Sequence, residues 1–198
     1  EYYRRWSLSW EAQALLRARG VAGSHKLIER FTSLADGVRY PEALDVNSLR
    51  EIKRIKARVE GERLPQGVDP RRHLKLGPGT LSDVEWLIQI VQLEHAHAVP
   101  ALRTTSTLAA LDVAVGAGFV PEEAGERLRE AWRLSSRLRS AMTLLTGQTK
   151  DVLPADPREL DGVGRILGYP DRSAVAVEEE YLRVTRRARK VFETLFYG

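Results

Sequence analysis

The sequence predicts an all-α protein, for two reasons. Apolar residues recur at three- and four-residue spacing along most of the chain, which is typical of amphipathic helices. No run alternates apolar and polar residues cleanly, as a half-buried strand would. With 198 residues, of which 43% are hydrophobic, the chain is long enough to bury a sizeable core. We therefore expect a bundle of about eight helices with a central buried helix.

Glycines, prolines and cap residues divide the helical pattern. Seven of the expected helices cover about residues 2–19, 24–38, 82–98, 105–117, 121–145, 157–167 and 175–196. Another begins at about residue 47 and ends before the loop at 65–79. Gly20 and Gly23 end the first helix. The second and third carry apolar stripes at helical spacing: Leu27, Phe31 and Leu34, then Leu49, Ile52, Ile55 and Val59.

The later helices have clear start and stop signals. Pro100 closes the helix at 82–98, and Gly118 follows the next one as a C-terminal glycine. Pro121 occupies the first turn of the longest helix, where proline is tolerated. The last helix has acidic residues early and basic residues late, which suits the helix dipole. These are Glu178, Glu179 and Glu180, then Arg186, Arg187, Arg189 and Lys190.

The helix at 82–98 is apolar on nearly all sides, so we expect it to be central. Its apolar residues are Trp86, Leu87, Ile88, Ile90, Val91 and Leu93. One narrow polar stripe, Glu85, Gln89 and Gln92, must be hydrogen-bonded or face a cleft. Asp83 points to the opposite side, so it cannot form a paired site with Glu85 on one helix face.

The start of this helix has two alternative capping registers. Ser82 with Glu85 three residues later forms a capping box, and Thr80 with Asp83 forms a competing one. In either register a carboxylate lies in the first turn, which the helix dipole favours. The preceding segment, 65–79, is the longest loop, with three prolines and three glycines. We expect a single domain, 1–198, with a subdivision into 1–64 and 80–198 as the alternative.

Several classes of function are excluded or disfavoured. The chain has no cysteine, hence no disulfide and no cysteine-based zinc site. His95 and His97 lie two residues apart on different helix faces, so we expect no metal. No apolar run reaches the ~20 residues of a membrane span. No signal peptide precedes the first helix, and we expect a cytoplasmic protein. Because the chain starts at Glu1, we expect it to be a piece of a longer protein.

Charge is concentrated in one part of the chain. The net charge is only +4, but the segment from Arg50 to Lys75 contains nine basic residues and only four acidic ones. Such a segment could meet phosphate or an acidic partner; the alternative is a solvated helix face. Aromatic residues are not interleaved with these charges, so nucleic acid is the least favoured partner.

The motifs around this loop resemble those of the glutamine-synthetase adenylyltransferase family. The family signature K-x-G-x-GG-x-x-D-[IV]-E-[FW]-x-x-Q matches Lys75, Gly77, Gly79, Asp83, Val84, Glu85, Trp86 and Gln89. An upstream segment matches at Trp10, Glu11, Ala14, Leu15, Ala18, Arg19, Val21, Ala22 and Gly23. Downstream matches are Thr107, Leu108, Leu111, Leu128, Ala131, Trp132, Leu153, Pro154, Gly168 and Tyr169. Two positions depart from the pattern: Thr80 replaces a glycine, and Trp86 replaces the commoner Phe.

The resemblance implies a tandem enzyme with two nucleotidyltransferase domains, each followed by a helical region. One half transfers AMP from ATP to a tyrosine of glutamine synthetase, and the other removes it by phosphorolysis. The chain resembles the helical region after the second, adenylylating domain, and we expect its end at Gly198 to be a natural C-terminus. The G-S-x-x-D-x-D motif that would hold Mg²⁺ is absent from the sequence. We therefore expect the chain alone to be inactive, to bind no cofactor, and to complete or regulate a catalytic site.

The resemblance also selects candidate site residues. Glu85 and Gln89 should face the nucleotide or target-tyrosine cleft, together with the loop of Lys75, Gly77 and Gly79. Lys75, and Arg17 or Arg19, could meet phosphate; the alternatives are an exposed lysine and arginines that cap a helix end. Expected partners are glutamine synthetase and the upstream nucleotidyltransferase domain. A helical docking module for glutamine synthetase or a PII-type signal protein, acting through Arg50–Lys75, is the alternative function.

Overall fold

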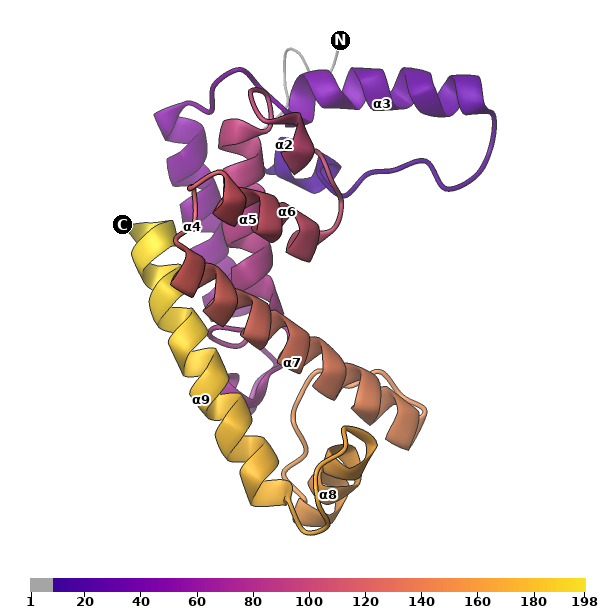
Figure 1. Ribbon diagram of the computed structural model, residues 1–198, viewed down its shortest axis with the longest axis vertical. Coiled ribbons are helices and arrows are strands. Elements are labelled where there is room, and N and C mark those ends of the chain that lie inside the picture. Colours follow the sequence, from indigo (N-terminus) through magenta and orange to yellow (C-terminus); the bar gives the residue numbers. More distant parts are fainter. Residues whose placement is uncertain (1–8) are drawn as a thin grey trace. The chain divides into compact units, whose positions relative to one another are not determined.

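The computed structural model describes residues 9–198, and within this range the chain is all-α, as predicted (Figure 1). The eight α-helices of this range are α2 (Ser9–Leu15), α3 (His25–Arg39), α4 (Val46–Glu62), α5 (Leu81–His95), α6 (Thr107–Gly116), α7 (Glu122–Thr146), α8 (Pro157–Ile166) and α9 (Ala174–Phe192). Three short helical turns accompany them: η1 (Pro70–Arg72), η2 (Pro100–Leu102) and the π-helical turn η3 (Glu193–Tyr197). The described residues form no strand, only one isolated bridge between His73 and Val152.

Two helices end earlier than expected. The start of the first predicted helix, residues 2–8, lies outside the described residues; α2 ends at Leu15 rather than at Arg19. The backbone N–H groups of Leu16, Arg17 and Ala18 each bond three residues back, a tighter turn that closes the helix before Gly20. Helix α5 ends at His95 rather than at Ala98. Residues 96–98 form a turn closed by the bond of 2.8 Å from the Val99 N–H to the His95 carbonyl, and Val99, which precedes Pro100, is not helical.

The chain divides into two compact units, neither of which is continuous in sequence. Unit 1 comprises Glu1–Ala57 and Trp86–Pro121, and unit 2 comprises Arg58–Glu85 and Glu122–Gly198. Of the three boundaries between them, one falls inside α4, one inside α5, and the third directly before α7.

Among its described residues, unit 1 has a small core and, on α3, an apolar helix face that is largely exposed. Its fully buried side chains include Leu16, Ile52, Leu93, Leu102 and Leu111. On α3, however, the predicted apolar stripe is largely exposed: Leu27, Phe31 and Leu34 are 65%, 47% and 64% accessible. A contiguous exposed apolar stripe is typical of a surface that binds another protein segment.

Unit 2 is built on α7 and α9, which pack along each other, with α8 against both (Figure 1). Its fully buried side chains include Leu128, Leu138, Met142, Tyr181 and Phe192. Helix α5 is buried along most of its length, from Leu81 to Leu93, which confirms the predicted central helix.

In the 75–80 loop, the backbone passes very close to α9. Gly79 has φ +72°, a left-handed conformation that residues with a Cβ rarely adopt. A Cβ at Gly79 would lie 1.9 Å from the carbonyl oxygen of Thr185, and a Cβ at Gly77 would lie 2.4 Å from two backbone oxygens, those of His73 and Pro70. Both glycines are therefore required by backbone packing.

We predict that Gly79→Ala destabilises the chain far more than Gly118→Ala. Gly118 also has positive φ, +79°, but a Cβ added there would meet nothing within 4 Å beyond its chain neighbours. Both substitutions incur the left-handed penalty of roughly 1–2 kcal/mol, and only Gly79→Ala adds a collision with backbone. In urea, the free energy of unfolding of the Gly79→Ala variant should be at least about 2 kcal/mol lower than that of the Gly118→Ala variant. Equal losses would show that the close approach to α9 is not constraining.

Candidate functional site

At the start of α5, the side chain that accepts a hydrogen bond from a backbone N–H group is that of Asp83, not that of Ser82. Helix α5 begins at Leu81, and the Asp83 carboxylate accepts a hydrogen bond of 2.6 Å from the Gly79 N–H. Ser82 lies inside the helix, and its N–H donates to the Lys75 carbonyl, so the predicted Ser82–Glu85 capping box is wrong. Thr80 donates from Oγ1 to the Gly77 carbonyl. This bond shows how threonine is accommodated where the resembling family has glycine.

Asp83 is also the centre of a charged cluster. Its carboxylate is 1% exposed and accepts a bond of 3.0 Å from Arg189 Nη1 on α9. The same guanidinium contacts Glu60, near the end of α4, at 2.9 Å and Glu193 at 2.7 Å. We call these four residues the Arg189 cluster; all belong to unit 2. A buried carboxylate without such a partner would cost several kcal/mol.

The pKa of Arg189 reflects this environment. Burial lowers it, but the hydrogen bonds to Glu60 and Glu193 and the charge of Asp83 raise it more, so the net pKa lies above its usual value. The guanidinium therefore stays charged at any accessible pH. The sequence-based interpretation placed Arg189 only among the dipole-favoured basic residues and missed this contact. The one available signal was Asp83 itself, an acid that lies outside the polar stripe of a largely apolar helix.

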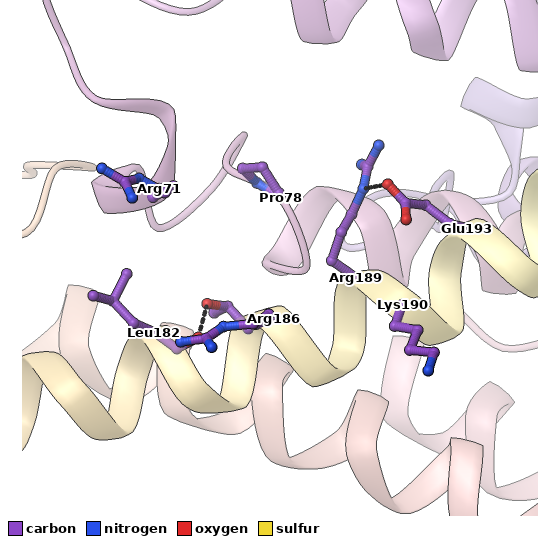
Figure 2. A pocket seen from close by; sticks show the side chains of 8 residues that line it. Arg71, Pro78, Leu182, Arg186, Arg189, Lys190 and Glu193 are labelled. Carbon is purple, nitrogen blue, oxygen red and sulfur yellow. Dashed lines mark hydrogen bonds and ion pairs between the residues drawn. The ribbon is translucent and has the colours of Figure 1, made fainter.

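A hollow of about 630 Å³ adjoins the Arg189 cluster (Figure 2). Its lining residues come from the 71–78 segment and from α9 and its end: Arg71, Pro78, Leu182, Thr185, Arg186, Arg189, Lys190 and Glu193. Much of its positive charge is already compensated. Arg71 is paired with Asp69 at 3.0 Å, and Arg189 is shared among three carboxylates. Arg186 and Lys190 remain exposed on α9.

The loop before α5 is held by hydrogen bonds to the segment after α7. The N–H of Leu74 donates to the Asp151 carbonyl at 2.7 Å, and the N–H of Leu153 donates to the Arg72 carbonyl at 2.8 Å. The Arg72 side chain pairs with Glu178 on α9. Within the loop, Nδ1 of the buried His73 accepts from the N–H groups of Lys75 and Leu76, at 3.3 and 3.1 Å.

The predicted site residues are divided between the two units. In unit 2, Lys75 is exposed, Gly77 and Gly79 are buried against backbone, and Glu85 is half-buried. Asp83, in the same unit, is buried in the Arg189 cluster, and the remaining predicted residues belong to unit 1.

In unit 1, the predicted residues are mostly engaged with their own unit. Gln89 Oε1 accepts a bond of 2.7 Å from Gln13, and Gln92 donates to the carbonyls of Leu102 and Thr104. Arg17 donates to the carbonyl of Thr105 and to Oγ1 of Thr107. Arg19 and Trp10 are exposed, and Glu11 and Trp86 are half-buried. The cap at the end of α2 comes from Arg39, which donates to the carbonyls of Leu15 and Ala18.

Three further expectations can be compared with the structure: the basic segment, the metal site and the membrane span. Within Arg50–Lys75, Lys56 is 1% exposed, so this residue does not contribute to a basic surface. Among residues 9–198, no group of three or more His, Asp or Glu side chains is arranged to hold a metal ion. None of the helices in the same range is both long and apolar enough to span a membrane.

Comparison with known proteins identifies the class to which this helical fold belongs. A family model described as GlnD PII-uridylyltransferase matches residues 49–196. The chain belongs to this family.

Curated relatives carry the name that the motifs pointed to. Proteins of Leifsonia xyli subsp. xyli, Streptomyces coelicolor and Mycobacterium leprae are 66%, 54% and 47% identical over 197, 198 and 196 residues, covering 100%, 100% and 98% of the chain. Each is named bifunctional glutamine synthetase adenylyltransferase/adenylyl-removing enzyme. The predicted resemblance to the adenylyltransferase family is confirmed. The chain spans only 20% of the length of each relative.

We predict that His73 makes the stability of the chain depend on pH. Burial lowers the pKa of His73 from its ordinary 6.5, with the Asp151 charge opposing. The unfolded chain therefore binds this proton more readily than the folded one. The contribution of neutral His73 to the free energy of unfolding is complete above pH 6.5. It is lost as the pH falls from 6.5 through the pKa of His73 in the folded chain. Urea unfolding at pH 7.5 and at lower pH values measures it.

His73→Asn is the matched control, because its side-chain oxygen can still accept from the loop N–H groups but does not titrate. The loss of stability on acidification below pH 6.5 should be smaller in His73→Asn than in the wild type. An identical loss in both proteins would show that other groups cause it.

Proposed function

We propose that the chain is the helical region that follows the adenylylating nucleotidyltransferase domain of a cytoplasmic, bifunctional glutamine synthetase adenylyltransferase/adenylyl-removing enzyme. The observation that carries this proposal is the name shared by the relatives, at 66% identity for the protein of Leifsonia xyli. In this enzyme, AMP from ATP is transferred to a tyrosine of glutamine synthetase and removed by phosphorolysis. The enzyme would thereby regulate nitrogen assimilation.

The chemistry would be supplied by the rest of the polypeptide. The sequence lacks the G-S-x-x-D-x-D motif that would hold Mg²⁺ and ATP. The role of the chain is then to support and position a catalytic domain. Its exposed α3 stripe, Leu27, Phe31 and Leu34, supports this role, because a neighbouring domain of the same polypeptide would bury it.

Within the chain, we assign Lys75 and Glu85 to the side that meets the nucleotide or the target tyrosine. Lys75 is exposed and Glu85 is half-buried, so both can be reached. Gly77 and Gly79 would act by shaping the loop, since backbone surrounds them. Gln89 would hold unit 1 together through Gln13, and Arg17 and Arg19 remain candidates for phosphate contact.

The alternative proposal is a docking module for glutamine synthetase or a PII-type signal protein. The description of the matching family, PII-uridylyltransferase, favours a PII-type partner, and the exposed Arg50, Arg54, Arg58 and Arg63 offer cations for an acidic surface. Pull-down at increasing salt separates the candidates. The docking proposal expects capture of glutamine synthetase or the PII-type protein, and a nucleic-acid binder would instead retain random DNA.

We predict that Glu85→Gln lowers AMP transfer by the intact parent enzyme without unfolding it. Because Ser82 is not the N-cap, Glu85 is not needed for a capping box, and removing its charge should leave helix α5 intact. Loss of one charge-assisted contact in the cleft predicts roughly a tenfold drop in kcat/KM. Mass spectrometry of AMP on glutamine synthetase measures the rate.

Glu94→Gln, a half-buried acid on the same helix, is the control and should retain wild-type activity. Wild-type rates in a normally folded Glu85→Gln enzyme would remove Glu85 from the site. Absence of AMP transfer by the wild-type parent itself would instead refute the proposed function.

A further inference from the structure

A second hollow in unit 2 has a different character from the one beside the Arg189 cluster. It has a volume of about 480 Å³ and is lined by Val59, Arg63, His73, Lys75, Leu76 and Asp151. Arg63 directly follows α4, and the loop before α5 supplies His73 and Lys75. All of these residues belong to unit 2, so the geometry of this hollow is internal to one compact unit.

His73 presents a hydrogen-bond donor to this hollow. The ring is 4% exposed, and its Nδ1 accepts from two backbone N–H groups, those of Lys75 and Leu76. An accepting Nδ1 leaves the proton of the neutral ring on Nε2. Nε2 has no hydrogen-bond partner among residues 9–198, and it is not among the atoms sealed from solvent. A largely buried imidazole therefore keeps one N–H directed at the open space.

Two cations share the hollow with this donor. Arg63 and Lys75 are exposed, and neither forms an ion pair with any of residues 9–198. The acid in the lining, Asp151, is already paired with Arg139, so it does not neutralise them. In the hollow beside the Arg189 cluster, by contrast, Arg71 and Arg189 are paired with carboxylates, and no histidine among residues 9–198 lines the space beside the exposed Arg186 and Lys190.

We propose that Arg63, His73 and Lys75 form a binding site for a phosphate group. A guanidinium, an ammonium and a neutral N–H donor around one space match the several acceptor oxygens of a tetrahedral oxyanion. The loop is pre-organised for this, because the backbone bonds to Nδ1 fix the ring and place Lys75 two residues along the same turn. The site does not depend on the assignment as an adenylyltransferase, since it follows from these contacts alone.

The test is a titration of the 198-residue chain with inorganic phosphate and, separately, with ATP, at constant ionic strength. Calorimetry gives the affinity, and the NMR signal of the His73 imidazole reports whether binding occurs at this hollow. Saturable binding of phosphate with a Kd below about 10 mM, accompanied by a shift of that signal, is the expected result. Roughly tenfold tighter binding of ATP at the same signal would identify the phosphate as that of a nucleotide, and comparable binding would identify free phosphate.

Arg63→Gln and Lys75→Gln change exposed residues and should not affect folding. Each should weaken phosphate binding about tenfold, the effect of losing one charge-assisted hydrogen bond. The matched control is Lys190→Gln, which removes an exposed cation of α9 outside this hollow and should leave the Kd unchanged. The proposal is overturned if neither phosphate nor ATP binds at about 10 mM, or if Lys190→Gln weakens binding as much as Lys75→Gln does.

Discussion

The buried contact between Asp83 and Arg189 is the constraint on which the site region of unit 2 depends. Asp83 is 1% exposed and serves two partners, the Gly79 N–H and the Arg189 guanidinium. One carboxylate thus fixes the last turn of the loop, the start of α5 and the side of α9. Removing Arg189 would leave the buried Asp83 carboxylate without the guanidinium that compensates its charge, which costs several kcal/mol. Removing Asp83 costs less, because Arg189 keeps its contacts with Glu60 and Glu193.

The glycines of the loop follow from this contact. With Asp83 held against α9, the backbone at Gly79 must pass within van der Waals distance of the Thr185 carbonyl, and a side chain has no room there. Gly77 is enclosed by backbone oxygens in the same way. The two glycines of the family motif are therefore explained first by packing. Lys75, His73 and Arg63 lie just outside this packed region, where the chain can meet a ligand.

The sequence was sufficient to predict the fold class and the central helix, because their signals are local. The apolar circumference of α5 and the end signals at Gly118 and Pro121 are read from neighbouring residues. The contact of Asp83 with Arg189 and the effect of the Asp151 charge on His73 could not be predicted, because Arg189 and Asp151 are distant in sequence. The sequence left the Ser82–Glu85 and Thr80–Asp83 capping registers open for a related reason: both satisfied local rules, and only the contact with α9 selects Asp83. The α3 stripe was predicted, but local periodicity does not reveal what covers it.

The most direct test of the central contact is a double-mutant cycle of Asp83→Asn and Arg189→Gln, with free energies of unfolding from urea denaturation. Arg189→Gln leaves the buried Asp83 carboxylate without its guanidinium, whereas Asp83→Asn leaves Arg189 in contact with Glu60 and Glu193. The double substitution removes both charges together. A coupling energy of at least about 1.5 kcal/mol is predicted, because contacting charged residues couple by roughly 0.5–3 kcal/mol. Additivity of the two losses within about 0.5 kcal/mol would contradict the account. The start of α5 would then be held by its own backbone and not by α9.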